Sequence, residues 1–305
     1  MQKHVQLWIA GSVGIDDIAT PHDNRPNQLG GSVSYACAAA SFFTKPGAVG
    51  VIGEDFPKEF FARYAKFGMD LAGMEQLPGR TFRWAGEYHG DMNTRTTLKT
   101  DLGVLEHFNP KLPAHFRPAP FIFLGNMQPQ IQLSLLDQVE GTPFVGLDTM
   151  NLWIDIAREP LLAVLKRVDV LLLNDEEARQ LSGRHHLRDC AAAIFGMGPR
   201  TLIIKKGEHG ALLFSQEGIA IVPAYPVRHV QDPTGAGDTY AGAFMGCLAS
   251  AGEPVTPRLM RKALLNASVV ASFGVEDFSF NALETLTPEK LRARCDELAR
   301  MIVIE

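Results

Sequence analysis

Cysteine is scarce in this sequence, and positive charge is not in excess. The 305 residues include four cysteines, at positions 37, 190, 247 and 295, and no two of them form a C-x-x-C pair. This spacing suits neither a zinc site nor a disulfide framework, and it favours a reducing, cytoplasmic location. The formal net charge of −5 gives no electrostatic basis for binding nucleic acid or a membrane surface.

Long hydrophobic runs and the common nucleotide motifs are also missing. The apolar segment 5–10 is too short for a signal sequence or a membrane span, and it predicts a first buried strand instead. Neither G-x-x-x-x-G-K-[ST] nor a well-placed G-x-G-x-x-G occurs, which disfavours a P-loop ATPase and a nicotinamide-dependent dehydrogenase. No repeat, low-complexity tract or evident linker interrupts the chain.

What the sequence does contain is a regular alternation of short apolar strands and helical segments. The runs 121–124, 144–147, 168–173 and 202–206 are nearly continuous in hydrophobic residues, as strands buried on both faces of a parallel sheet are. Parallel strands joined by helices predict an α/β fold with a doubly wound, mostly parallel sheet flanked by helices. Asp148 then lies at a strand exit, on the rim where such sheets bind ligands.

The most informative segment is 232–240, which reads D-P-T-G-A-G-D-T-Y. Small residues before a helix leave backbone N–H groups accessible, and the helix dipole adds positive potential, so Gly235, Ala236 and Gly237 can form an anion hole. Asp238 would place a carboxylate beside that hole, where a base could deprotonate a nucleophile that attacks a phosphate. On spacing alone, an ordinary helix start explains the same residues equally well.

Two further motifs follow strands in the second half of the chain. Asn174 and Glu177 form an N-x-x-E pattern, which is a capping box and also a plausible neighbour of Mg²⁺. A G-x-x-G turn runs from Gly207 to Gly210 after a buried strand, with Lys206 directly before it.

These motifs, in this order, resemble the ribokinase-like (PfkB) carbohydrate kinase family. The resemblance covers nearly the whole chain and implies a single ribokinase-like domain, residues 1–305, with a small β-sheet lid contributed by about 14–30 and 78–105. The pattern of 81–105 independently predicts a hairpin, because polar and large residues alternate there. Arg83, Arg95 and Lys99 of this hairpin could contact an anionic substrate or simply be solvated.

The resemblance also implies which residues bind ATP and cations. Glu177 would hold Mg²⁺ through water, and Asp232 and Thr234 would form a site for a monovalent cation such as K⁺, although a turn held by these side chains accounts for them as well. The implied nucleotide-binding residues are Asn174, Lys206, Gly207, Gly210, Asn266 and Gly274.

At the acceptor end, the sequence departs from the family pattern. The implied substrate residues are Asp16, Gly30, Gly31 and Tyr35. The family often has asparagine where this chain has Gly14 and Tyr35, and a phenol cannot replace the paired donor and acceptor of an amide. Tyr35 and the lid aromatics Phe82, Trp84 and Tyr88 could instead stack on a base.

We therefore expect an ATP-dependent kinase that phosphorylates a hydroxyl of a sugar or sugar-like small molecule. A nucleoside kinase of the same fold is the alternative within the family. A metabolite-binding protein that has lost catalysis is the alternative of another class, although the retained Asp238 argues against it. The resemblance also implies a homodimer that pairs through the lid.

Overall fold

Short strands, largely buried except at the two edges, form the central sheet of the protein. The structure, a computed structural model, describes residues 5–303. Nine strands lie in the order β13-β12-β11-β10-β9-β8-β1-β4-β5, and all neighbours are parallel except at β11-β12 and β12-β13. The predicted mostly parallel sheet is confirmed. Their bounds are β1 Leu7–Ala10, β4 Pro46–Ile52, β5 Asp70–Gln76, β8 Phe121–Leu124, β9 Phe144–Asp148, β10 Val170–Asn174, β11 Thr201–Lys205, β12 Ala211–Ser215 and β13 Gly218–Val222.

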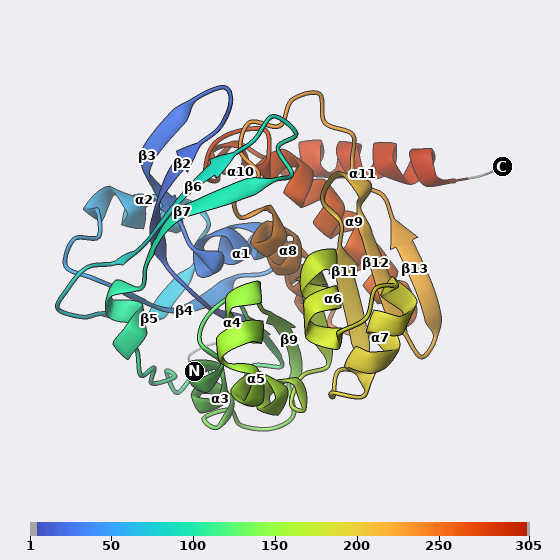
Figure 1. The fold of residues 1–305 in the computed structure, drawn as a ribbon, viewed down its shortest axis with the longest axis horizontal. Coiled ribbons are helices and arrows are strands. Elements are labelled where there is room, and N and C mark those ends of the chain that lie inside the picture. The colour runs from blue at the N-terminus through green and yellow to red at the C-terminus, as the bar shows by residue number, and fades with distance from the viewer. Residues whose placement is uncertain (1–4, 304–305) are drawn as a thin grey trace.

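Helices cover both faces of this sheet, as Figure 1 shows. Alternate residues of one strand enter different cores: Leu7 and Ile9 pack with one set of helices, Trp8 and Ala10 with the other. This explains why the strands are apolar throughout instead of alternating with polar residues. The first set comprises α1 Ser32–Ala40, α2 Lys58–Lys66, α8 Ala236–Ser250, α9 Pro257–Gly274, α10 Asn281–Glu284 and α11 Pro288–Ile302; the second contains α3 Pro129–Leu136, α4 Asn151–Ile156, α5 Arg158–Leu165, α6 Asp175–Ser182 and α7 Leu187–Phe195.

Helices α1 and α8 pack against each other at very short range. A Cβ atom on Gly242 would lie 2.1 Å from the Ala36 carbonyl oxygen, and one on Gly246 would lie 2.8 Å from the Ala40 Cα atom. The small residues of both helices therefore serve close backbone contact. This packing holds the first turn of α8 against the carboxyl ends of the strands.

A second, four-stranded sheet lies over one end of the main sheet (Figure 1). Its order is β3-β2-β6-β7, and the strands are β2 Gly14–Ala19, β3 Asn24–Gly30, β6 Phe82–Tyr88 and β7 Arg95–Asp101. The strands fall within the two ranges predicted for the lid. The polar, proline-containing segment 20–28 is consistent with a projecting loop or with part of the lid, and most of it lies in the lid strand β3.

Two other features of residues 5–303 bear on the sequence predictions. The four cysteines are free thiols, and three of them are buried. No helix in this part of the chain is long and apolar enough to cross a membrane.

Candidate active site

The first turn of α8 begins at a glycine that no other residue could replace without strain. Gly235 has φ 71°, and a Cβ atom there would lie 2.3 Å from the Tyr35 ring. The Ala236 N–H donates to the Pro233 carbonyl at 3.1 Å, so it is already used. Among the described residues, Gly235 and Gly237 have no acceptor for their N–H groups, as expected at a helix start. These two donors remain available for an anion.

Asp238 follows in the same turn and is partly buried. Burial and the nearby Asp148 raise the pKa of its carboxyl, the positive charges of Lys205 and Arg95 lower it, and the resulting pKa is about 7. A carboxylate with a pKa near neutrality can take and release a proton at physiological pH. This is the property that the predicted role of base requires.

An ion pair that sequence reasoning missed lies beside this turn. The Lys205 Nζ atom is 2.5 Å from Asp148 Oδ2, and it is 3.1 Å from the point where Gly237 would carry a Cβ. Lys205 ends β11 and Asp148 ends β9, so both reach the carboxyl rim of the sheet. The G-x-x-G turn indicated Lys206 as the cation near the nucleotide. Lys205 could have been found from its position at the end of a predicted strand, because such residues reach the carboxyl rim of the sheet.

Lys206, Gly207 and Gly210 form the G-x-x-G turn next to this pair. Gly207 has φ 54° and Gly210 has φ 84°, which explains both glycines. The Lys206 side chain takes part in no ion pair within residues 5–303. Its predicted contact with phosphate stays a prediction.

Asn174 and Glu177 form the reciprocal capping box at the start of α6. The Asn174 side chain accepts from the Glu177 N–H and the Glu177 carboxyl accepts from the Asn174 N–H, both at 2.8 Å. Burial and the Asp148 charge raise the pKa of Glu177 to about 7.

The described residues contain no group of three or more metal-ligating side chains. One Glu177 oxygen is left without a protein partner by the capping box. A hydrated Mg²⁺ fits this arrangement, because Mg²⁺ keeps several of its waters and needs only one or two carboxylates.

On the other side of Gly235, two buried polar atoms have no partner among the described residues. They are Asp16 Oδ1 and the Tyr35 hydroxyl. A Cβ on Gly30 would lie 1.9 Å from Asp16 Oδ2, and one on Gly31, at φ 90°, would meet the Ser12 carbonyl oxygen. Gly30 therefore makes room for the Asp16 side chain of β2, and Gly31 makes room for the backbone that leads into β2. Burial, with Asp232 and Asp238, raises the pKa of Asp16 well above its usual value.

Buried polar atoms are normally hydrogen-bonded, so an unpaired pair of this kind needs a physical explanation. A ligand that carries hydroxyl groups would supply partners for both atoms. The charge of Asp16 acts on Tyr35. Binding of an acceptor by these two residues stays a prediction.

The predicted cation residues are already engaged by protein groups. Asp232 Oδ1 accepts from the Thr234 N–H at 2.8 Å and Oδ2 from the Ser279 N–H at 3.1 Å. The Thr234 hydroxyl donates to the Tyr88 hydroxyl at 3.1 Å. These bonds account for the turn without a cation, and the K⁺ site stays a prediction.

Asn266 and Gly274 lie on α9, and only Gly274 is near the first turn of α8, because Asn266 lies beside Cys247 toward the other end of that helix. The Asn266 amide donates to the Lys262 carbonyl at 2.8 Å, and its oxygen accepts from the Cys295 thiol at 3.5 Å. A Cβ on Gly274 would lie 3.6 Å from Thr239, so the end of α9 contacts the start of α8. Contact of either residue with adenine stays a prediction.

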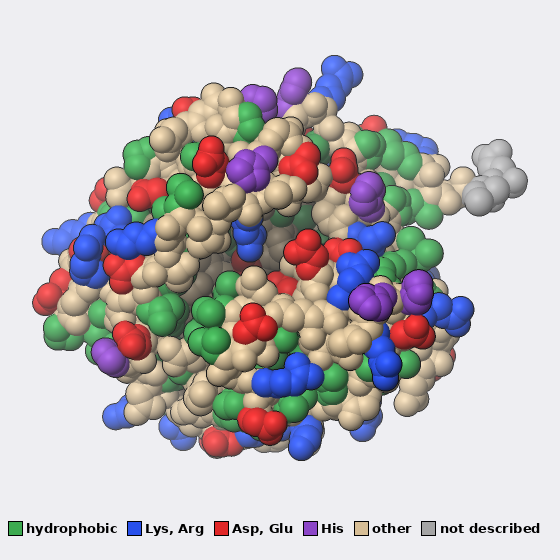
Figure 2. All heavy atoms as spheres, viewed as in Figure 1, with side chains coloured by type: hydrophobic (Ala, Val, Ile, Leu, Met, Phe, Trp, Pro, Cys, Tyr) green, Lys and Arg blue, Asp and Glu red, His purple; other side chains and the backbone are tan. Residues whose placement is uncertain are grey.

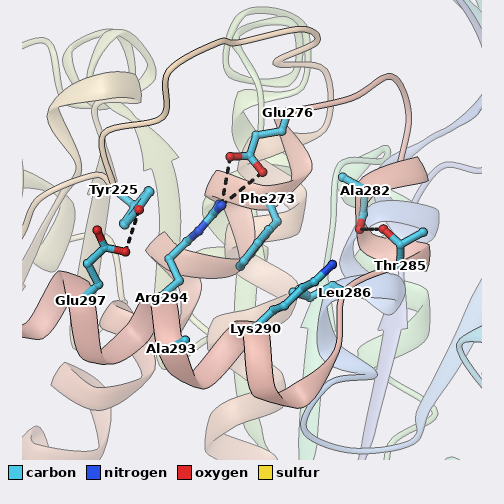
Figure 3. Close-up of a pocket in the computed structure, with 10 residues that line it drawn as sticks. All are labelled: Tyr225, Phe273, Glu276, Ala282, Thr285, Leu286, Lys290, Ala293, Arg294 and Glu297. Carbon is cyan, nitrogen blue, oxygen red and sulfur yellow. Dashed lines mark hydrogen bonds and ion pairs between the residues drawn. The ribbon is translucent and has the colours of Figure 1, made fainter.

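The space-filling view shows a hollow between the lid sheet and helices α4 and α6, with acidic side chains at its edge (Figure 2). A separate surface pocket of about 460 Å³ lies between α9, α10 and α11 (Figure 3). Its polar groups are largely paired: Arg294 with Glu276 at 3.0 Å, and Tyr225 with Glu297 at 2.9 Å. None of the predicted site residues lines this pocket.

Comparisons with known proteins bear on this geometry. A model of the pfkB family of carbohydrate kinases matches residues 26–284. A cytidine kinase from Thermococcus kodakarensis is 30% identical over 248 residues, which make up 79% of this chain and 87% of that protein.

Two solved structures share the fold. A nucleoside kinase from Burkholderia thailandensis in complex with inosine has a TM-score of 0.77 at 18% identity and covers 95% of this chain and 96% of its own. A ribokinase II-type protein from E. coli in complex with ATP and Mg²⁺ has a TM-score of 0.75 at 19% identity, with 96% and 99% covered. The family match over most of the sequence is independent of these structures, and by it the chain belongs to the PfkB family of carbohydrate kinases, a family of phosphotransferase enzymes.

Proposed function

We propose that this protein transfers the γ-phosphate of ATP to a hydroxyl group of a nucleoside. The observation that carries the proposal is the environment of Asp238. Its carboxyl lies in the first turn of α8 with the free N–H groups of Gly235 and Gly237, and its charge acts on Asp16 and Tyr35, whose polar atoms lack partners. A base, anion-binding groups and acceptor-binding groups are therefore neighbours.

In the proposed reaction, the acceptor oxygen attacks the γ-phosphorus in line with the β–γ bridging oxygen. A new P–O bond forms, the bridging P–O bond breaks with its electrons going to ADP, and the hydroxyl proton passes to Asp238. The N–H groups of Gly235 and Gly237 stabilise the charge on the transferring phosphoryl group. Lys205, held by Asp148, adds a fixed positive charge on the same side.

Glu177 and Asn174 would hold Mg²⁺ through water near the phosphates. Bound there, the ion would neutralise phosphate charge and orient the leaving group. The E. coli protein of the same fold binds ATP and Mg²⁺, which supports both as cofactors of this chain.

A nucleoside is preferred over a simple sugar on two grounds. The T. kodakarensis relative is a cytidine kinase, and the B. thailandensis structure holds inosine. In this chain, the Trp84 indole packs against Gly86, where a Cβ would be 2.1 Å from the ring, and its N–H donates to Thr97 at 3.4 Å. The indole is therefore held along the lid, available to stack on a base.

A sugar such as ribose is the second candidate, because Asp16 and Tyr35 would recognise hydroxyl groups that sugars and the ribose of a nucleoside share. The test is ADP release from MgATP with cytidine, inosine, adenosine, ribose and fructose as separate acceptors, and mass spectrometry of the product. We expect phosphorylation of a nucleoside. Turnover with the free sugars alone would assign the sugar instead.

Asp238→Asn is the matched control, because it keeps the shape of the side chain and removes the base. ADP release that persists unchanged in this variant would refute the role of Asp238. If no acceptor gave ADP while a nucleoside still bound, the protein would be the non-catalytic binder.

A further inference from the structure

The segment between α9 and α10 packs against residues of the candidate site. Phe280 lies edge-on to Tyr35, with 5.7 Å between the ring centroids. Phe278 belongs to a small buried cluster that contains Tyr88 of the lid. Ser279 lies between these two aromatic residues and is buried with them. The packing of its neighbours therefore fixes the place of Ser279 in the molecule.

Ser279 is hydrogen-bonded to two parts of the site, which we call the phosphate side, residues 232–238, and the acceptor side, the predicted substrate residues. Its backbone N–H donates to Asp232 Oδ2 at 3.1 Å, and its hydroxyl donates to the Leu29 carbonyl at 2.5 Å. Asp232 also accepts from the Thr234 N–H at 2.8 Å, so it orients the turn that leads into α8. Leu29 directly precedes Gly30, one of the predicted substrate residues. One residue thus joins the phosphate side to the acceptor side.

The backbone of Ser279 has the left-handed conformation, with φ 54°. Two other non-glycine residues within 5–303 have positive φ, Asn27 and Met92, and neither is buried, whereas Ser279 is 1% exposed. A non-glycine residue keeps such a conformation only where its surroundings hold it, and residues of this kind concentrate at functional sites. Glycine would adopt the same backbone without strain and could not donate to Leu29. The hydroxyl bond is therefore what serine adds at this position.

We propose that Ser279 is a positioning residue for phosphoryl transfer, which holds the acceptor side in register with the phosphate side. The inference rests on the proposed kinase function of this site. Asp238 belongs to the first turn of α8 and Asp16 to β2, so the two sides come from distant parts of the chain. Leu29 and Ser279 are 250 positions apart. The acceptor oxygen must lie in line with the γ-phosphorus at close range, and a displacement of about 1 Å can lower the rate about 100-fold.

The first test compares Ser279→Gly with Ser279→Ala. Ser279→Gly removes the bond to Leu29 and relieves the left-handed strain, so its Tm should stay within about 2 °C of the wild type. With a nucleoside acceptor, we expect it to lower kcat about 100-fold and to leave KM for MgATP unchanged, because the N–H bond to Asp232 remains. Ser279→Ala should show the same loss of kcat and a lower Tm, since alanine keeps the strain without the bond.

Asn27→Gly is the matched control, because it makes the same backbone change at an exposed position with φ 53°. It should match the wild type in kcat. If Ser279→Gly also turned over like the wild type, the hydroxyl would have no positioning role and the inference would be wrong. A Ser279→Gly protein with a much lower Tm and a raised KM for MgATP would point to general loss of structure, which also overturns the inference.

The second test uses no acceptor, so it does not depend on the identity of the substrate. Hydrogen–deuterium exchange of the full chain is measured with and without Mg²⁺ and AMP-PNP. In the wild type, we expect the nucleotide analogue to slow exchange at 232–240, where it binds, and at 29–35, which Ser279 joins to that turn. In Ser279→Gly, protection at 232–240 should remain and protection at 29–35 should be lost.

Equal protection of 29–35 in both proteins would overturn the positioning role, whichever acceptor the enzyme uses. A wild type that gains protection at 232–240 alone would overturn it as well. No protection at 232–240 in the wild type would instead contradict the proposed nucleotide site, and the inference would fail together with the proposed function.

Discussion

The Lys205 Nζ atom and Asp148 Oδ2, 2.5 Å apart, join the carboxyl ends of β11 and β9 beside the first turn of α8. Asp148 is buried and Lys205 is mostly buried, so each compensates the charge of the other. The pair sets the charge next to the unpaired N–H groups of Gly235 and Gly237. It also raises the pKa of Asp238 through Asp148 and opposes that rise through Lys205.

Lys205→Met should reduce both stability and activity. Removing one partner leaves Asp148 buried and unpaired, which we expect to cost about 2–3 kcal/mol of unfolding free energy, somewhat less than a fully buried pair. Activity should fall about 100-fold through loss of the phosphate-side cation. Denaturant unfolding and kcat measurements check the two effects.

The double variant Lys205→Met/Asp148→Asn separates these effects. It removes both charges, so much of the lost stability should return while activity stays low. Recovery of activity along with stability would mean that Lys205 serves only as the structural partner of Asp148.

The pH dependence of kcat/KM should report the carboxyls at the site. Asp238 must be ionised to accept a proton, and its pKa is about 7, as is that of Glu177. We expect kcat/KM to rise with pH up to about 7 and then level off. Below pH 7, kcat/KM should fall more steeply than the protonation of a single group would cause. In the Glu177→Gln variant, the slope should be that of a single protonation. A flat profile between pH 5 and 8 would contradict the assignment of Asp238 as base.

The same carboxyl should reduce stability in its ionised form. The pKa of Asp238 is higher in the folded protein than its ordinary value, so between about pH 4 and 7 the folded state binds more protons than the unfolded chain, and stability falls as pH rises. Asp238→Asn removes this effect. Its Tm should exceed that of the wild type at pH 8, and the difference should shrink as the pH is lowered toward 4. Glu87→Gln, an exposed lid variant, is the control.

Much of the phosphate side could be predicted from the sequence because its signals are local. Gly235 and Asp238 are fixed by one helix start, and Asn174 with Glu177 by one capping box. The alternation of apolar strands and helices predicted the sheet, since its inner strands are buried on both faces.

The Lys205–Asp148 pair and the position of Arg95 could not be predicted in this way. The members of the pair are 57 positions apart, and only the sheet order brings their strand ends together. The orientation of Arg95 depends on the hairpin register, in which a bulge between Ala85 and Gly86 shifts the pairing. A one-residue change of register would turn Arg95 to the other face.

Tyr35→Phe tests whether the acceptor end is built for a ligand. The phenyl ring would keep the edge contact with Phe280, at 5.7 Å between ring centroids, and the contact with Gly235. Only the buried hydroxyl, which has no partner among the described residues, is lost. Since an unpaired buried polar group costs about 1–3 kcal/mol, the variant should be as stable as the wild type or more so.

The cost should appear in acceptor binding instead. If the Tyr35 hydroxyl donates to the acceptor, Tyr35→Phe should raise the acceptor KM about tenfold, corresponding to one hydrogen bond of about 1.4 kcal/mol, and leave KM for MgATP unchanged. Lower stability with an unchanged acceptor KM would show that the hydroxyl has a structural role. Unchanged or higher stability together with a raised acceptor KM would show that the hydroxyl bonds to the acceptor. In the free protein this hydroxyl then has no partner, which lowers the stability of the folded state.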